Sequence, residues 1–215
     1  MYLPAHFKED RPGVLHDLIR AHPLATLVTL DASGLVANHI PMEIDPEEGE
    51  RGTLRGHVAR ANPVWSSHRP DVEAMAVFQG PLSYISPSYY ATKAATGKVV
   101  PTWNYATVHA YGPLRAIEDA AWLRRLIEGL TDRHEAERAQ ATGDPAWKVS
   151  DAPAGYIDGL VKAIVGIELP ITRIEGKWKV SQNRPAEDRA GVVAGLGKAE
   201  DPMRLAMAAL VRERG

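Results

Sequence analysis

The order of strand and helix patterns predicts an α+β fold, in which a small antiparallel β-barrel carries helices at its periphery. Short strand patterns separated by turn signals occupy the first half of the chain, and helical patterns dominate from residue 118 onward. With 215 residues, of which 45% are hydrophobic, the chain is long enough to bury one large core. We therefore expect one domain over residues 1–215, with helical additions near 118–162 and 186–214.

The first half of the chain reads as a series of strands. A short helix is expected after Asp10, which would act as its cap. A strand over 24–30 and its return over 35–44 flank a turn at 31–34, where Gly34 is free to adopt a positive φ. Further strands are expected over 53–58, over 72–78 and around 83–86. A long strand over 102–117 would bend at Gly112-Pro113.

The second half is predicted to be mainly helical. One helix begins near residue 118 and presents an apolar face made of Trp122, Leu123, Leu126, Ile127 and Leu130. Shorter helices are expected over 153–161, 186–196 and 202–214. Between them, segments 163–174 and 177–180 would form a hairpin that turns at Glu175-Gly176.

Composition excludes several classes of protein. The chain contains no cysteine, which removes disulfides, thiolate metal sites and cysteine nucleophiles, and fits a cytoplasmic location. No apolar run reaches about 18 residues, so no membrane span is expected. The net charge of −2 argues against wholesale nucleic-acid binding. The candidate DNA contacts on the long helix are offset by neighbouring carboxylates, which favours a solvated face; these contacts are Arg124, Arg125, Arg133 and Arg138.

The histidines do not predict a metal site. His39, His57 and His109 lie on strand patterns, but no carboxylate or thiolate stands at ligand spacing from them. Hydrogen-bonded histidines in the core are the favoured interpretation, and we expect no metal.

Segment 56–65, GHVARANPVW, leads from a strand into a helix start. Asn62 is a cap residue and Pro63 suits the first helical position. The first amides of a helix favour an anion, and Arg60 adds a guanidinium suited to phosphate. The alternative is a surface arginine beside an ordinary capped helix, and the segment alone leaves both open.

Segments 98–105, KVVPTWNY, and 177–189, KWKVSQNRPAEDR, interleave aromatic rings with polar groups. In the first, alternation puts Trp103 and Tyr105 on one face and Thr102 and Asn104 on the other, unless the two rings only fill the core. The second offers several donors together with the indole of Trp178. Such a mixture fits a planar, anionic ligand such as a flavin nucleotide. Asp188 and Arg189 would equally well pair with Arg184 or with each other to fix the corner.

At these residues the chain resembles the PaiB-like family of FMN-binding negative transcriptional regulators. The resemblance runs almost from end to end, through MYLPAHF, HPLATLVT, GHVARANPVW, VFQGPLSYISPSYY, TGKVVPTWNYATVHAYG, VSDAP, AIVGIEL, KWKVSQNRPAEDR and GVVAGL. It implies an antiparallel split β-barrel related to pyridoxamine phosphate oxidases. It also implies FMN as cofactor, bound at the subunit interface of a homodimer.

The resemblance further implies a set of cofactor-binding residues and assigns no catalytic one. Asn38, His39 and Ile40 would lie along the flavin ring. His57, Val58, Ala59 and Arg60 would lead to the phosphate. The facing subunit would supply Thr102, Trp103, Asn104, Gln182 and Arg184, and Lys98 or Arg184 would stabilise the anionic reduced ring.

The leading functional hypothesis is therefore an FMN-binding transcriptional regulator that acts as a homodimer, through flavin state, a regulatory protein or DNA. The alternative is an FMN-dependent oxidoreductase that uses a reduced nicotinamide or a small substrate. A third hypothesis replaces FMN with haem and makes His39, His57 or His109 its ligand.

Overall fold

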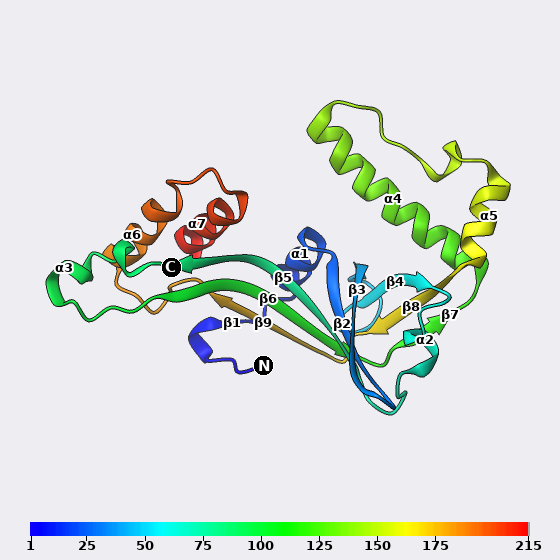
Figure 1. The fold of residues 1–215 in the computed structure, drawn as a ribbon, viewed down its shortest axis with the longest axis horizontal. Helices are drawn as coiled ribbons and strands as arrows, with labels where there is room; N and C mark the ends of the chain where they lie inside the picture. The colour runs from blue at the N-terminus through cyan, green and yellow to red at the C-terminus, as the bar shows by residue number, and fades with distance from the viewer. Residues whose placement is uncertain (215) are drawn as a thin grey trace. The chain divides into compact units, whose positions relative to one another are not determined.

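The computed structural model describes residues 1–214 and shows an α+β fold built on antiparallel strands (Figure 1). Within these residues the sheet has nine strands in the order β1-β9-β6-β5-β2-β3-β4-β8-β7. The chain divides into two compact units. Of the described residues, unit 1 comprises 1–22, 78–109 and 175–214, and unit 2 comprises 23–77 and 110–174.

Unit 2 holds most of the strands. Its elements are β2 (Leu24–Asp31), β3 (Gly34–Asp45), β4 (Thr53–Ala59), α2 (Val64–Ser67), β7 (Arg115–Ile117), α4 (Ala120–Thr142), η3 (Val149–Asp151), α5 (Ala154–Lys162) and β8 (Ile164–Pro170). Unit 1 contains η1 (Ala5–Phe7), β1 (Lys8–Glu9), α1 (Pro12–Ala21), η2 (Pro87–Tyr89), α3 (Thr92–Thr96), α6 (Ala186–Leu196) and α7 (Pro202–Arg214). Strands β5 (Ala74–Ile85), β6 (Thr102–Gly112) and β9 (Arg173–Lys179) contribute residues to both.

The predicted hairpin at residues 31–34 is present. Asp31 pairs with Gly34, whose φ is 119°, and the register continues to Leu24 opposite Pro41. Because successive side chains of a strand alternate between its faces, β2, β3 and β4 each present one core face. The residues of that face are almost fully buried: Ala25, Leu27, Ile40, Met42, Leu54 and Val58.

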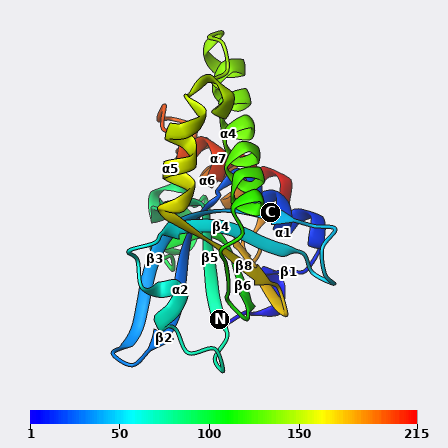
Figure 2. The same ribbon diagram turned by 90° about the vertical axis from the view of Figure 1, so that its right-hand side faces the viewer.

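Helices α4 and α5 form a small satellite core in unit 2, and Figure 2 shows them side by side. Asp119 caps α4, since its carboxylate accepts a hydrogen bond of 2.6 Å from the amide of Trp122. Leu123 packs with Val149, Ile157 and Val161 in this core. The predicted apolar stripe of α4 is therefore partly confirmed: Leu123, Leu126 and Leu130 are buried.

Several predicted elements differ from the structure. One continuous strand, β5, replaces the two expected over 72–78 and around 83–86. Helix α3 and strand β1 were not predicted. The expected bend at Gly112-Pro113 is a true break, since β6 ends at Gly112 and β7 begins at Arg115. Asp10 does not cap α1: its carboxylate accepts from Lys8, and Arg11 takes the cap position without a side-chain bond.

The predicted hairpin at Glu175-Gly176 is wrong. Strand β8 pairs with β4 and β7, whereas β9 lies between β1 and β6 in the sheet. Gly176 lies inside β9, opposite Glu9 of β1. A Cβ on Gly176 would lie 2.2 Å from Leu15 Cδ2, so this glycine permits close packing of α1 and forms no turn.

Candidate functional site

The predicted flavin-ring segment of β3 divides between the two faces of its strand. Ile40 is buried in the core of unit 2, and His39 is exposed on the opposite face. Asn38 lies on the core side, where its Oδ1 accepts a 2.8 Å hydrogen bond from Asn62. The Nδ2 of Asn38 is buried without a partner among the described residues. This amide is a donor that a ligand acceptor would satisfy.

The β4 segment divides in the same way. Val58 is buried in the core, whereas Ala59 is exposed. His57 faces Gly166 of β8, and its Nδ1 is buried without a hydrogen-bond partner within residues 1–214. Burial lowers the pKa of His57, which favours the neutral imidazole. His57 therefore shares the outer face with His39, and Asn38 lies on the core face.

Arg60 is held by protein groups at the end of β4. Its Nε donates to the carbonyl of Lys162 at 3.0 Å and its Nη2 donates to that of Ile164 at 3.2 Å. Its Nη1 donates to Glu118 at 2.6 Å. Asn62 does cap the short helix α2, accepting from the amide of Val64 at 3.0 Å. In this arrangement a phosphate would have to compete with Glu118 for Arg60.

In unit 1, the predicted residues around the start of β6 are well defined. Asn104 is buried and its Nδ2 donates to Ser181 Oγ at 2.9 Å. The polar side chain of Asn104 thus has its hydrogen-bond partner within the protein. Trp103 is 53% exposed and meets Tyr84 edge to face, with ring centroids 5.9 Å apart. An exposed indole on a strand leaves a planar surface available to a ring. Lys98 is exposed in the segment that follows α3.

The turn after β9 is closed by side chains that the sequence predicted as donors. Gln182 accepts from the amide of Val180 at 2.8 Å and donates to the carbonyl of Trp178 at 2.6 Å. Ser181 has a φ of 68°, the only positive φ of a described non-glycine residue. Arg184 lies over the ring of Tyr90, 4.6 Å from its centroid. Arg184 therefore makes a cation–π contact with Tyr90.

The corner residues have structural roles. Asp188 is buried, and its two oxygens accept from the amide and the hydroxyl of Thr92, at 2.9 and 2.8 Å. Arg189 donates to the carbonyl of Arg184 at 2.6 Å. The corner is thus held by hydrogen bonds, but Asp188 pairs with Thr92 and not, as the sequence suggested, with Arg184 or Arg189.

Lys177 and Lys179 were not among the cofactor-binding residues expected from the sequence, although both belong to the segment predicted to face a planar, anionic ligand. They share one face of β9, because they are two residues apart in a strand. Lys179 donates to Thr102 Oγ1 and to the carbonyl of Trp103, both at 2.5 Å. Burial lowers the pKa of Lys179, and the charges of Lys177 and Arg184 lower it further. We call Lys177, Lys179 and Arg184 the cationic cluster. The spacing of two residues between Lys177 and Lys179 in a predicted strand was the sequence signal that could have identified the lysines.

The residues of unit 1 fit the anionic, planar character of a flavin nucleotide. The cationic cluster supplies positive charge, and Trp103 supplies an exposed ring. In unit 2, the Nδ2 of Asn38 and the Nδ1 of His57 are buried without partners among residues 1–214, on opposite faces of the sheet. Bound FMN would supply electron-transfer chemistry, and the cationic cluster and Trp103 of unit 1 would bind and orient it.

The arginines predicted as DNA contacts are mostly paired. Arg124 bonds to Asp158, Arg133 lies 3.5 Å from Glu137, and Arg138 lies 2.8 Å from Glu135. This pairing favours the solvated-face interpretation of α4. Among residues 1–214, no three His, Asp or Glu side chains gather to hold a metal ion. Within the same residues, every helix is too short or too polar to cross a bilayer.

Comparisons with known proteins identify the family and the cofactor. The family described as "Putative FMN-binding domain" matches residues 1–173. An uncharacterized protein of Emericella nidulans is 38% identical over 247 residues, covering 100% of this chain and 98% of that protein. The Bacillus subtilis protease synthase and sporulation protein PAI 2 is 29% identical over 215 residues, with the same coverage.

Solved structures share the fold. The FAD and haem binding protein from Mycobacterium smegmatis superposes with a TM-score of 0.54 at 16% identity, covering 80% of this chain and 73% of that one. The predicted split barrel and the predicted cofactor, FMN, are confirmed by these findings taken together. The chain therefore belongs to the FMN-binding domain family, as its PaiB-like motifs predicted.

Proposed function

We propose that this chain is a homodimeric transcriptional regulator whose output depends on its bound flavin. The regulatory role is supported by the full-length similarity to the protease synthase and sporulation protein PAI 2. Three of the four arginines on α4 are paired with carboxylates, so we expect the output to pass through flavin state or a regulatory protein in preference to DNA contact by α4.

The observation that carries the homodimer is the outer face of β2 and β3 in unit 2. Leu35 is 80% exposed and Leu24 is 59% exposed, at the two ends of this hairpin. Between them lie Ala37 opposite Val28 and His39 opposite Thr26. An exposed sheet face on which apolar side chains predominate is characteristic of an interaction surface. A second copy would cover it and place His39 of each subunit at the interface.

The homodimer is tested by a charge in the middle of this face. Ala37→Glu would bury an unpaired carboxylate in the interface, and we expect a monomer at concentrations where the wild type is a dimer, measured by analytical ultracentrifugation. Ala37 is exposed within the chain, so the substitution should leave folding intact. Ala141→Glu, on exposed α4, is the matched control and should remain dimeric. A monomeric wild type, or a dimeric Ala37→Glu variant, would remove this support.

The dependence on flavin is tested with the same preparations. We expect a visible flavin spectrum from the purified protein, or its appearance after FMN is added. A colourless protein that takes up no FMN would refute the proposal. A Soret band in the spectrum would instead favour haem as the cofactor. Binding to promoter DNA should differ between the oxidised and the reduced protein if the output is direct. If a partner protein is used, capture of that partner should differ in the same way.

The cationic cluster favours a second candidate function, an FMN-dependent oxidoreductase. Three positive charges close together stabilise negative charge that develops on a bound group, and reduced flavin is anionic. Lys179→Met should therefore lower the midpoint potential of bound FMN by about 30 mV, which is tenfold in a two-electron equilibrium. Lys198→Met, an exposed lysine outside the cluster, should leave the potential unchanged. Failure of NADH and NADPH to bleach the flavin would count against this candidate.

A further inference from the structure

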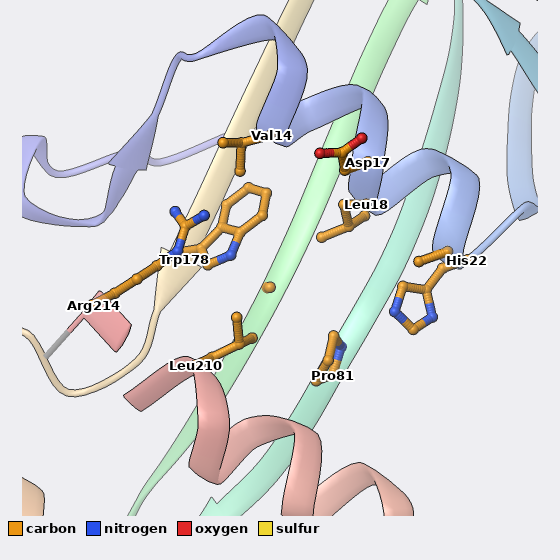
Figure 3. A pocket seen from close by; sticks show the side chains of 10 residues that line it. Val14, Asp17, Leu18, His22, Pro81, Trp178, Leu210 and Arg214 are labelled. Atoms are coloured by element: carbon orange, nitrogen blue, oxygen red, sulfur yellow. The ribbon is translucent and has the colours of Figure 1, made fainter. Parts of the chain in front are cut away.

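A cavity lies in unit 1, between helices α1 and α7 (Figure 3). Its volume is about 300 Å³. Leu18 of α1 and Leu210 of α7 face one another across it, Pro81 of β5 borders it, and Trp178 of β9 lines one end. This volume is at the lower limit of small-molecule sites, so the cavity would hold a small ligand.

The cavity is open because a small residue lies beneath it. Ala106 of β6 is fully buried and contributes only a methyl group. The surrounding walls are apolar, with Val14, Leu18 and Leu210 among their side chains. Trp178 is 4% exposed, so its indole belongs to this wall and is turned away from the solvent. An apolar chain or ring would remove the cavity walls from water.

Charge is unevenly distributed around the cavity. Arg214 lines it and lies over Trp178, 4.9 Å from the ring centroid. Arg214 bonds to Glu9, but the same carboxylate is also bound by Arg11, whose Nε and Nη2 donate at 2.9 and 2.6 Å. One carboxylate thus serves two guanidinium groups, which leaves an excess positive charge at this end. Asp17, on the rim, is paired with Arg20 at 2.9 Å.

We infer that this cavity binds a small amphipathic carboxylate. The apolar body would lie over Ala106 between Leu18 and Leu210, and the carboxylate would accept hydrogen bonds from Arg214. A guanidinium has five N–H donors in a planar fork, so Arg214 can serve Glu9 and a ligand carboxylate together. None of the residues predicted to bind FMN lines this cavity, so the site is separate from the flavin residues.

The test is a calorimetric titration of the purified holoprotein with octanoate, octanol and octylamine. We expect octanoate to bind saturably, and at least tenfold more tightly than octylamine. Arg214→Gln should weaken octanoate at least tenfold while changing octanol less than twofold, because only the carboxylate uses the guanidinium. The control is Arg11→Gln. It removes an equal charge from the same Glu9 but removes no hydrogen-bond donor from the cavity, so it should weaken octanoate less than threefold, well below the effect of Arg214→Gln.

A second variant tests the location. Ala106→Leu should fill the cavity and abolish binding of both octanoate and octanol. Thermal unfolding and the flavin spectrum of each variant establish that it is folded, and Arg214→Gln alone decides the matter if Ala106→Leu does not fold. The inference is overturned if wild type gives no saturable heat with octanoate, if Arg214→Gln binds octanoate as wild type does, or if Arg11→Gln weakens it equally.

Discussion

Helix α6 lies so closely on Tyr89 that a single methyl group should disturb the fold. A Cβ added to Gly195 would lie 2.3 Å from Cδ1 and 2.6 Å from Cε1 of Tyr89. Carbon atoms in contact are about 3.5–4.0 Å apart, so the ring would have to withdraw by more than an ångström. The Tyr89 hydroxyl accepts a 2.9 Å hydrogen bond from Arg204 of α7, which restrains that movement. At Gly191 the obstacle is the Tyr89 carbonyl oxygen, at 1.9 Å.

The magnitude follows from opposing contributions. Overpacking of this kind costs about 1–3 kcal/mol, whereas replacing glycine with alanine inside a helix recovers about 1 kcal/mol. We expect Gly195→Ala to lower the free energy of unfolding by about 1 kcal/mol, the middle of this difference. Gly191→Ala should cost more, about 2 kcal/mol, because a backbone carbonyl cannot rotate aside as a ring can. For a chain of this size, 1 kcal/mol corresponds to a change of about 2–4 °C in Tm.

Gly159 of α5 provides the matched control. It is exposed in the helix, and a Cβ there would meet nothing within 4 Å. Gly159→Ala should therefore raise stability by about 0.5–1 kcal/mol. Thermal and urea unfolding of the three variants measure these differences, and adding Tyr89→Ala to Gly195→Ala should remove most of the overpacking cost. If Gly195→Ala gained stability as Gly159→Ala does, the close packing of Tyr89 on α6 would be refuted.

Two further predictions concern buried carboxylates. The pKa of Glu9 is lowered to about 2, mainly by the hydrogen bond from Arg11, so Glu9 adds stability above pH 4.5 that is lost as the pH falls toward 2. Glu9→Gln should flatten the fall in stability over that window, by about 1–2 kcal/mol after solvent screening, and an unchanged acid-unfolding curve would contradict this. Asp188→Ala leaves the amide and hydroxyl of Thr92 unpaired and should cost about 1–3 kcal/mol in urea unfolding; Glu187→Ala, on the exposed side of α6, should cost less than 0.5 kcal/mol.

The parts of the fold that depend on nearby residues were predictable from the sequence. The strand patterns over 24–30 and 35–44 and the turn at Gly34 predicted the β2–β3 hairpin, because these signals act within a few residues. The error at Gly176 has the opposite cause. A glycine after a glutamate resembles a turn. Position 176 instead requires glycine because Leu15, far away in the sequence, leaves no room for a Cβ there. Close approach between distant elements leaves no local pattern.

The candidate site shows the same division. The types of residue were predictable: donors, cations and exposed rings gather in the segments where the sequence placed them. Their partners were not, because Glu118 reaches Arg60 and Thr92 reaches Asp188 across 58 and 96 residues. A polar residue predicted as a ligand contact can therefore be occupied by a distant residue of its own chain.

Strand β9 illustrates how far alternation alone could have gone. In the segment KWKV, the period of two separates Lys177 and Lys179 from Trp178. The indole and the two ammonium groups thus cannot contact one ligand from the same face of β9, although all three belong to the segment that was predicted to bind a planar ligand. The structure assigns Trp178 to the cavity beneath α1 and α7, and it leaves the lysines beside Tyr105 and Thr102. One segment therefore contributes to two sites of different chemistry, and a substitution at Trp178 should affect octanoate binding without changing the flavin potential.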